Sequence, residues 1–411
     1  MNITDGTTAA TGRLRALGQS VWIDDLTRDM IAGGDLVHLR ESGVTGITAN
    51  PTTFDKAVTG SSVYDADIRR LAGHRAATGI LWDLLVDDVR HAAAVFRQVY
   101  DRTGGADGFV SIEVAPDIAA DTEATTRMAR ELWERCDSPN VLVKVPATAQ
   151  GVPAMRRLLE DGVNVNATLI FSVERYREVA EAYLSALEAR RERGRPIDRV
   201  ASVASFFVSR VDTKVDGELK RRLEGAEGEE RERLGGLLGT IGVANSRHAF
   251  ERFRGLFSGE RWDALAAGGA RPQRCLWAST SAKDPSFPAT KYVEALAGPD
   301  TVDTMPLETF EALAGASLDG PALERDLDAA REQLSRLDAL GIDLRRITAE
   351  LETEGVRSFE ESYRHLGHAI DEKVTANGWD RVQVAGEHSF PASDAPGSTG
   401  DTIEGAPARR T

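Results

Sequence analysis

Cysteine, lysine and net positive charge are all scarce in this chain of 411 residues. Cys136 and Cys275 are the only cysteines, and two in a chain of this length give no disulfide framework. We expect two reduced core thiols, with a pairing of the two as the alternative. The formal net charge of -15 argues against the basic surface that nucleic acids and anionic membranes require. We therefore expect neither as a partner, and an anionic substrate would need a local cluster of arginines.

Long apolar runs are absent, and none reaches the length of a bilayer. The start, Met-Asn-Ile-Thr-Asp, has no basic n-region and no apolar h-region, so we expect a soluble, cytoplasmic protein. Small polar residues over 1–13 and a segment rich in Ser, Gly, Pro, Asp and Ala over 386–411 predict disordered ends. Residues 14–376 are expected to form a single domain, with a charged helical insertion around 212–267.

Eight strand-like runs alternate with helical patterns, and eight βα repeats are the number that closes a barrel. The sequence therefore predicts an α/β fold, a TIM-type (β/α)8 barrel with helical insertions and C-terminal helices. A doubly wound open sheet is the alternative, weakened because no glycine-rich fingerprint follows the first run. Helices are predicted over 121–136, 151–161, 173–193, 321–340, 343–353 and 355–375. The strands are predicted at Ser20–Asp24, Val44–Asn50, Phe109–Val114, Val141–Pro146, 166–171, Val200–Val208, Pro272–Ser279 and Thr301–Met305.

Lys144 lies among aliphatic residues in the run Val141–Pro146, which shows no alternation, as in a parallel strand covered on both faces. Burial disfavours the charged form, so we expect a neutral amine that can form a Schiff base with a ketone or aldehyde. The alternative is a strand-end lysine that reaches water. Lysine occurs at only seven positions, whereas arginine supplies most basic residues. A codon-biased genome would produce this, but a lysine needed for its chemistry would remain, because arginine cannot form an imine.

Polar residues gather at the ends of the predicted strands, where barrels place their chemistry. Each has an ordinary explanation as well: Asp24 or Asp25 could cap a helix, and Glu113 could form a structural ion pair. Barrel geometry would make them converge. Imine chemistry needs such groups, because a carboxylate must move protons and an arginine can bind phosphate. The set comprises Asp24, Asn50, Glu113, Lys144, Asn166, Thr168, Ser205, Arg210 and Ser279.

Several segments resemble the transaldolases of the pentose phosphate pathway. The similarity covers residues 14–376 and is closest to the longer bacterial branch, which also carries a stretch like Leu276–Pro285. It implies a TIM-type barrel and a transferase without cofactor or metal. A dihydroxyacetone unit would move from sedoheptulose 7-phosphate to glyceraldehyde 3-phosphate, giving erythrose 4-phosphate and fructose 6-phosphate. The segments are Ile47–Phe54 (Ile-Thr-Ala-Asn-Pro-Thr-Thr-Phe), Val143–Thr148 (Val-Lys-Val-Pro-Ala-Thr), Asn164–Ser172 and Ser205–Asp212.

The resemblance assigns the catalytic roles to four residues. Lys144 would form the Schiff base and Asp24 would be the acid/base. Glu113 and Thr168 would position the catalytic water.

Substrate contacts follow from the same resemblance. Asn50 and Asn166 would bind the dihydroxyacetone unit, with Ser205 nearby, and Arg210 would bind phosphate. The shorter branch has a second arginine after the strand-seven serine, where this chain has Ser279-Thr-Ser-Ala-Lys. Lys283 or Ser281 would complete the phosphate site, and a surface lysine is the alternative for Lys283.

Two rival activities stay open at this point. Related aldolases that split fructose 6-phosphate tend to have glutamine at the Glu113 position and tyrosine at the Phe207 position, so this chain resembles the transferases. A sugar-phosphate-binding protein without catalysis would not need Asp24, Glu113, Lys144 and Thr168 together. A monomer and a homodimer are both open, and Phe359 and Tyr363 are expected to be core contacts rather than lid residues.

Overall fold

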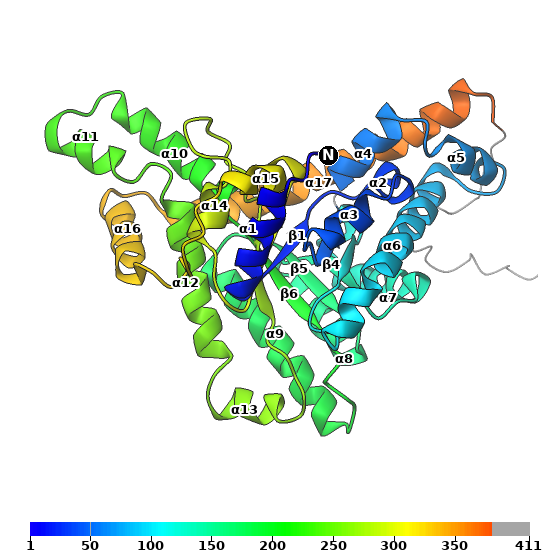
Figure 1. The fold of residues 1–411 in the computed structure, drawn as a ribbon, viewed down its shortest axis with the longest axis horizontal. Coiled ribbons are helices and arrows are strands. Elements are labelled where there is room, and N and C mark those ends of the chain that lie inside the picture. Colours follow the sequence, from blue (N-terminus) through cyan, green and yellow to red (C-terminus); the bar gives the residue numbers. More distant parts are fainter. Residues whose placement is uncertain (50, 380–411) are drawn as a thin grey trace, which may run out of the picture.

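The barrel predicted from the alternating pattern is confirmed. The computed structural model describes residues 1–49 and 51–379, except for the side chains of residues 51, 52 and 56. Eight parallel strands close in sequence order, β1 pairing with β8 (Figure 1). The strands are β1 Gln19–Ile23, β2 Gly46–Thr48, β3 Val110–Glu113, β4 Val141–Pro146, β5 Val165–Ile170, β6 Ser202–Phe207, β7 Arg274–Ala278 and β8 Thr301–Met305.

The strands are apolar on both faces because helices surround the barrel and side chains fill its interior. In β4, Val141, Val143 and Val145 pack outward in the large core under the helices, whereas Leu142 belongs to the inner cluster. Successive side chains of a strand point to opposite faces. Lys144 therefore shares the inner face with Leu142. The inner cluster also contains Trp22, Val203, Leu276 and Val302.

The amino end of the barrel is closed by side chains. Trp22 lies across Gly46, where a Cβ atom would come within 2.6 Å of the indole ring, so only glycine fits. The indole Nε1 donates to Asp107 Oδ1 at 2.9 Å, and Arg274 donates to Ser20 Oγ at 2.7 Å. This plug separates the amino end from the carboxyl ends of the strands.

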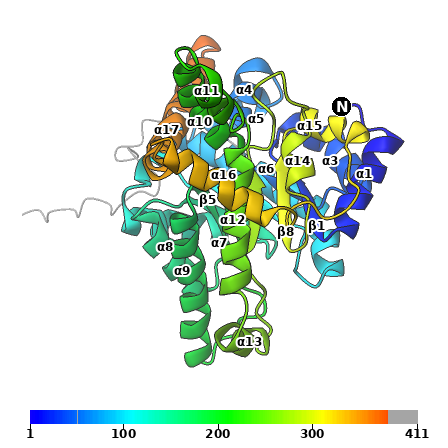
Figure 2. The same cartoon turned by 90° about the vertical axis from the view of Figure 1, so that its left-hand side faces the viewer.

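Helices cover the outside of the barrel and extend from it (Figures 1 and 2). No described helix is both long and apolar enough to cross a bilayer. The helices are α1 Asp5–Ala16, α2 Arg28–Ala32, α3 Asp35–Glu41, α4 Pro51–Gly60, α5 Asp65–Ala72, α6 Ala77–Arg102, η1 Pro116–Ile118, α7 Thr122–Cys136, α8 Gly151–Asp161, α9 Val173–Glu192, α10 Ser209–Leu223, α11 Gly228–Gly235, α12 Ile241–Leu256, α13 Glu260–Ala266, α14 Lys291–Ala295, α15 Leu307–Ala312, η2 Leu313–Gly315, α16 Leu327–Ala339 and α17 Leu344–Ala376.

Two sequence-based expectations about the ends of the chain need correction. Disorder over 1–13 is wrong from residue 5 onward: Thr4 caps α1, and Ala10 and Leu14 pack into the core. The two predicted helices 343–353 and 355–375 are one helix, α17. The expected disorder over 386–411 lies outside the described residues, and the assignment of 14–376 to one domain stays a prediction.

The helix α17 runs from one side of the molecule to the other. Figure 1 shows α10 and α11 projecting on one side and α4, α5 and the end of α17 on the other. Ion pairs fix α17 along its length: Lys214 of α10 binds Glu350 at 3.0 Å, and Lys373 binds Asp65 of α5 at 2.6 Å. Gly355 of α17 lies against Leu169, the last residue but one of β5, so α17 lies over the carboxyl end of the barrel.

Candidate active site

A cavity of about 300 Å³ opens at the carboxyl ends of the strands. Its wall is formed by side chains from β2, β4, β5, β6, β7 and β8, from the loops after β1, β7 and β8, and from α4, α10 and α17. Barrel geometry thus brings together residues that lie far apart in the sequence. The predicted site residues that line the cavity are Asp24, Lys144, Thr168, Ser205, Phe207, Arg210, Ser279, Ser281 and Lys283.

Lys144 and Glu113 form a buried ion pair beside this cavity. They are register partners on β4 and β3, and Lys144 Nζ donates to Glu113 Oε2 at 2.8 Å. Their side chains are 9% and 5% exposed. Burial raises the pKa of Glu113, while the Lys144 charge opposes that rise. The pair gives the amine a proton acceptor on the neighbouring strand; the expectation of a neutral amine stays a prediction.

Asp24 is partly buried directly after β1, where its backbone N–H donates to the Met305 carbonyl. Burial, and then the neighbouring Asp25 charge, raise the pKa of Asp24 to about 7, against the opposing effects of Lys144 and Lys283. A carboxyl group with such a pKa exchanges protons near neutral pH.

Helix capping was the ordinary alternative for Asp24 and Asp25, and the structure shows that Asp25 has this role. Its carboxylate accepts from Thr53 Oγ1 at 2.9 Å and from the Leu307 N–H, at the start of α15, at 3.3 Å. The nearby helix α2 is capped by Thr27. The two adjacent carboxylates therefore have different surroundings, and Asp24 is the candidate for chemistry.

Asn166 lies beneath the cavity wall, fully buried. Its Nδ2 donates to Ser111 Oγ at 3.1 Å, and its Oδ1 accepts from Ser205 Oγ at 2.7 Å. Asn166 thus orients Ser205, which does line the cavity. The other predicted amide, Asn50, lies outside the described residues.

Thr168 occupies an irregular part of β5. The pairing with β6 shifts between Ala167 and Ile170, and Leu169 has a φ of 59°. The Thr168 Oγ1 and Glu113 Oε1 atoms are both buried and have no hydrogen-bond partner in the described part of the chain. Buried polar atoms without partners are rare, because each loses its hydration without compensation. Both atoms are therefore free to bind a water molecule or a substrate group.

Cationic and hydroxyl groups also line the cavity. The Arg210 guanidinium stands 5.1 Å from the centroid of the Phe207 ring. Ser279, with a φ of 56°, shares a 2.9 Å hydrogen bond with Ser209. The exposed Lys283 donates to Ser281 Oγ at 2.8 Å, so the two candidates for completing a phosphate site lie together.

Sequence reasoning did not single out Phe359 as a site residue. Its ring is buried in the inner cluster and also lines the cavity, with its centroid 5.4 Å from Lys144 Nζ. It is thus both a core contact and a lid residue. Tyr363 packs against the core, and its hydroxyl accepts from Trp82 Nε1 at 3.0 Å. No pattern within 355–375 could show this, because it depends on where α17 lies.

Asp303 of β8 was also missed, although its strand was predicted. It is fully buried, Oδ1 accepts from Thr280 Oγ1 at 2.9 Å, and Oδ2 has no partner among the described residues. Burial raises the pKa of Asp303 to about 8. A carboxyl residue within a predicted barrel strand was the available signal.

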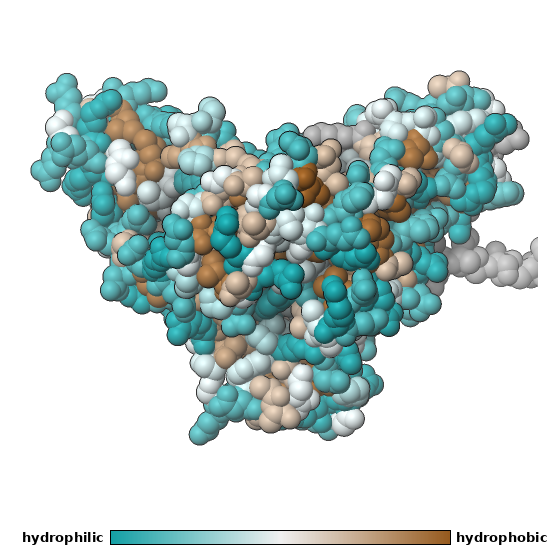
Figure 3. All heavy atoms as spheres, in the orientation of Figure 1, coloured by the Kyte–Doolittle hydropathy of each residue, from teal (hydrophilic) through white to brown (hydrophobic). Residues whose placement is uncertain are grey.

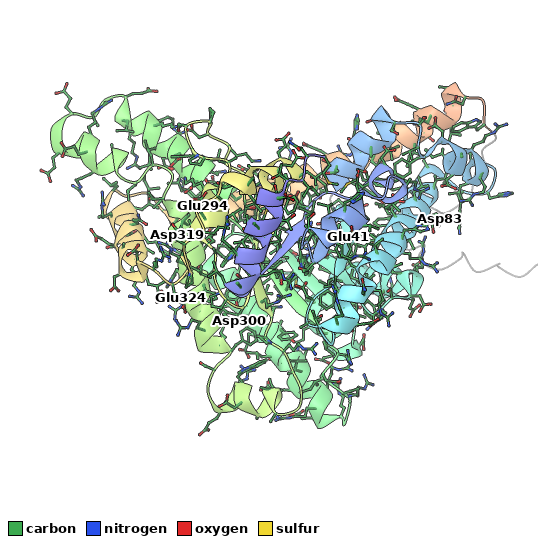
Figure 4. All side chains as sticks on the ribbon, viewed as in Figure 1. Glu41, Asp83, Glu294, Asp300, Asp319 and Glu324 are labelled. Carbon is green, nitrogen blue, oxygen red and sulfur yellow. The ribbon has the colours of Figure 1, made fainter. Side chains whose placement is uncertain are left out.

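Acidic side chains also occur on several described elements away from the cavity. Figure 4 labels six, including Glu41 on α3, Asp83 on α6 and Glu324 before α16. The face seen in Figure 3 is mostly hydrophilic with small, separate hydrophobic areas. Among the described residues, no group of three or more His, Cys, Asp or Glu is placed to hold a metal ion.

A closed (β/α)8 barrel with a buried lysine and carboxyl groups at the carboxyl ends of its strands has the architecture of a barrel enzyme. The family model described as Transaldolase/Fructose-6-phosphate aldolase matches residues 21–370. The chain belongs to this family.

Curated relatives agree with that assignment. A protein named Transaldolase from Saccharopolyspora erythraea is 45% identical over 360 residues, covering 87% of this chain and 95% of the relative. Transaldolase from Acidothermus cellulolyticus is 46% identical over 360 residues, with the same coverage. Transaldolase from Thermobifida fusca is 42% identical over 368 residues, covering 89% of this chain and 98% of the relative. The predicted resemblance to transaldolases and the prediction of a transferase are confirmed.

Proposed function

We propose that this chain transfers a dihydroxyacetone unit between sugar phosphates through a Schiff base on Lys144. The donor is sedoheptulose 7-phosphate and the acceptor glyceraldehyde 3-phosphate, giving erythrose 4-phosphate and fructose 6-phosphate. The observation that carries the proposal is the buried amine of Lys144, which faces a cavity and contacts Glu113. Burying a lysine amine costs solvation free energy, so a buried amine that faces a cavity favours a chemical role over a structural one.

In the first half-reaction the amine attacks the ketose carbonyl carbon. The resulting carbinolamine loses water after its hydroxyl is protonated, and an imine forms. Asp24, as carboxylate, then takes the proton of the C4 hydroxyl, the C3–C4 bond breaks, and the aldehyde product leaves. The electron pair of the broken C3–C4 bond moves into the protonated imine, so the bound fragment remains as an enamine. The enamine then attacks the acceptor aldehyde in the reverse sequence.

Glu113 and Thr168 support these proton transfers in the proposal. Each has a buried oxygen without a partner among the described residues. A water bound between such groups can carry a proton to the carbinolamine hydroxyl. The carboxyl and hydroxyl groups hold the water, and Asp24 exchanges protons with it.

The proposal assigns substrate binding to side chains that line the cavity. In the proposal, Arg210 binds phosphate together with Ser279, Ser281 and Lys283, which line the same cavity, because a guanidinium and hydroxyls satisfy phosphate oxygens. Ser205 lines the cavity and donates to Asn166, and the proposal assigns it to the dihydroxyacetone hydroxyls. Asn50 and Asn166 are assigned to the same fragment by family resemblance.

Transfer is favoured over simple cleavage by two apolar rings that line the cavity. Phe207 has no hydroxyl to activate a water molecule, and Phe359 covers Lys144. Excluding water keeps the enamine from being released before an acceptor arrives. We also place the protein in the cytoplasm, where the buried free thiols of Cys136 and Cys275 would stay reduced.

Borohydride trapping tests the proposal. The protein is incubated with fructose 6-phosphate, reduced, digested and analysed by mass spectrometry. A three-carbon adduct on Lys144 is expected, and Lys283, exposed at the same cavity, serves as the internal control. Lys144→Arg should retain charge but give neither adduct nor turnover, since arginine forms no imine. An adduct on another lysine, or none, would overturn the proposal.

A further inference from the structure

Leu169 has an unusual backbone conformation within a barrel strand. Its φ of 59° places it in the left-handed region, where a leucine is strained by its Cβ. The other described non-glycine residues with positive φ lie outside the helices and strands: Asp137, Ser279, Asp300 and Asp326. Strain of this kind persists only where surrounding contacts hold it, and such residues cluster at functional sites.

The strain coincides with a β-bulge. Ala167 pairs with Ala204 of β6, and the next partners are Ile170 and Phe206, so β5 has one residue more than β6 between these pairs. Ala167 and Ile170 both pack outward under the helices, whereas Thr168 lines the cavity and Leu169 joins the inner cluster. The bulge therefore turns two consecutive side chains, Thr168 and Leu169, to the inside of the barrel.

The Leu169 side chain is held by a notch in α17. A Cβ atom at Gly355 would lie 3.0 Å from Leu169 Cδ2 and 3.5 Å from Cδ1, so the leucine occupies the space where other residues have a side chain. Glycine within a helix is unfavourable, and this close approach explains it. Phe359, one turn further along the same helix, covers Lys144. One face of α17 thus contacts both the bulge and the amine.

We infer that Leu169 and Gly355 are positioning residues. The notch at Gly355 of α17 holds Leu169, and with it the strained bulge, so that the Thr168 hydroxyl faces the reacting centre. This inference rests on the proposed function and deepens it. Thr168 would touch the catalytic water, and Leu169 and Gly355 would act only through Thr168. A regular strand would turn either Thr168 or its neighbour away from the cavity, because side chains alternate.

Gly355→Ala tests the notch, with Gly367→Ala as the matched control in the same helix. A Cβ at Gly367 has no heavy atom within 4 Å, so both variants gain the same helix propensity and only one displaces Leu169. Gly355→Ala should lower kcat by about tenfold, as small misplacements of catalytic groups do, and leave KM within about twofold. Gly367→Ala should leave both unchanged. An unchanged kcat in folded Gly355→Ala would overturn the inference.

A double-mutant cycle with Thr168→Ala shows whether the effect passes through the hydroxyl. In the Thr168→Ala background, Gly355→Ala should lower kcat no further. Leu169→Ala removes the side chain without overpacking. It should lower kcat on its own but not in the Thr168→Ala background, and it replaces Gly355→Ala in the cycle if that variant does not fold. If the losses of kcat caused by the two single substitutions multiply in the double variant, the inference is overturned. The borohydride adduct on Lys144 is measured alongside: if wild type forms it and the cycle is multiplicative, only this inference fails, whereas absence of the adduct removes the proposed function as well.

Discussion

Phe359 lies over Lys144, with its ring centroid 5.4 Å from Nζ, although the two residues belong to α17 and β4. The ring can stabilise the ammonium through its π face and keeps the amine out of bulk water. The same contact that completes the apolar core of the barrel mouth therefore also shields the proposed reaction intermediate. A site with both properties can retain a bound enamine until an acceptor enters.

Replacing Phe359 by leucine should convert part of the transfer activity into cleavage. The smaller side chain admits water to the enamine, so dihydroxyacetone release without an acceptor should rise by about three- to tenfold relative to transfer. Tyr363→Phe is the control, because it removes only a hydroxyl bonded to Trp82. Both rates are measured with fructose 6-phosphate, with and without erythrose 4-phosphate. An unchanged ratio would show that Phe359 only packs.

Asp24→Asn should remove the limb of the pH profile that lies near pH 7. As a base, Asp24 must be ionised, so kcat/KM of the wild type should rise with pH up to the raised pKa of about 7. The variant should lose activity by about 10²- to 10⁴-fold and should lack that limb. Asp25→Asn is the informative partner: removing its charge lowers the pKa of Asp24, so the limb should move to lower pH. A limb that stays in place in Asp24→Asn belongs to another group.

Arg210→Ala should raise KM for phosphorylated sugars by roughly ten- to a hundredfold, because the charge-assisted hydrogen bonds to phosphate are lost. The effect on kcat should be smaller. Lys283→Ala and Ser281→Ala then separate the two candidates for completing the phosphate site. Because Lys283 is exposed, its effect should be a few-fold and should shrink at high salt. Steady-state kinetics at two ionic strengths measure this. Equal KM values for wild type and Arg210→Ala would remove Arg210 from the phosphate site.

Asp303 should make the protein less stable at alkaline pH. The pKa of this buried carboxyl rises to about 8 on folding, so the folded chain holds a proton that the unfolded chain loses above its ordinary pKa near 4. Its contribution to the free energy of unfolding therefore falls as pH rises between about 4 and 8. Asp303→Asn should be more stable than wild type at pH 9 by about 1–3 kcal/mol and nearly equal at pH 5.

Urea unfolding of both proteins at pH 5, 7 and 9 measures that difference. The exposed Asp319→Asn change should give none at any pH. A constant difference between wild type and Asp303→Asn across the three pH values would mean that Asp303 does not titrate on unfolding.

Much of the secondary structure followed from local pattern. Strands 141–146 and 301–305 and helix 151–161 were predicted to the residue, because apolar periodicity and flanking glycine or proline are local signals. The missed helix α1 begins with small residues, several of them glycine or threonine, and its stability comes from the Thr4 cap and from contacts with distant elements. Local composition therefore indicated disorder where tertiary packing produced a helix.

The sequence by itself determined the barrel and the chemical groups at its carboxyl end, because each depends on the order of residue types along one strand and its neighbours. Only the tertiary structure decided that α17 crosses the mouth, that Phe359 covers Lys144, and that Gly355 holds Leu169 in a left-handed conformation. These are contacts between segments far apart in the chain, and their energies come from close packing that no local pattern encodes.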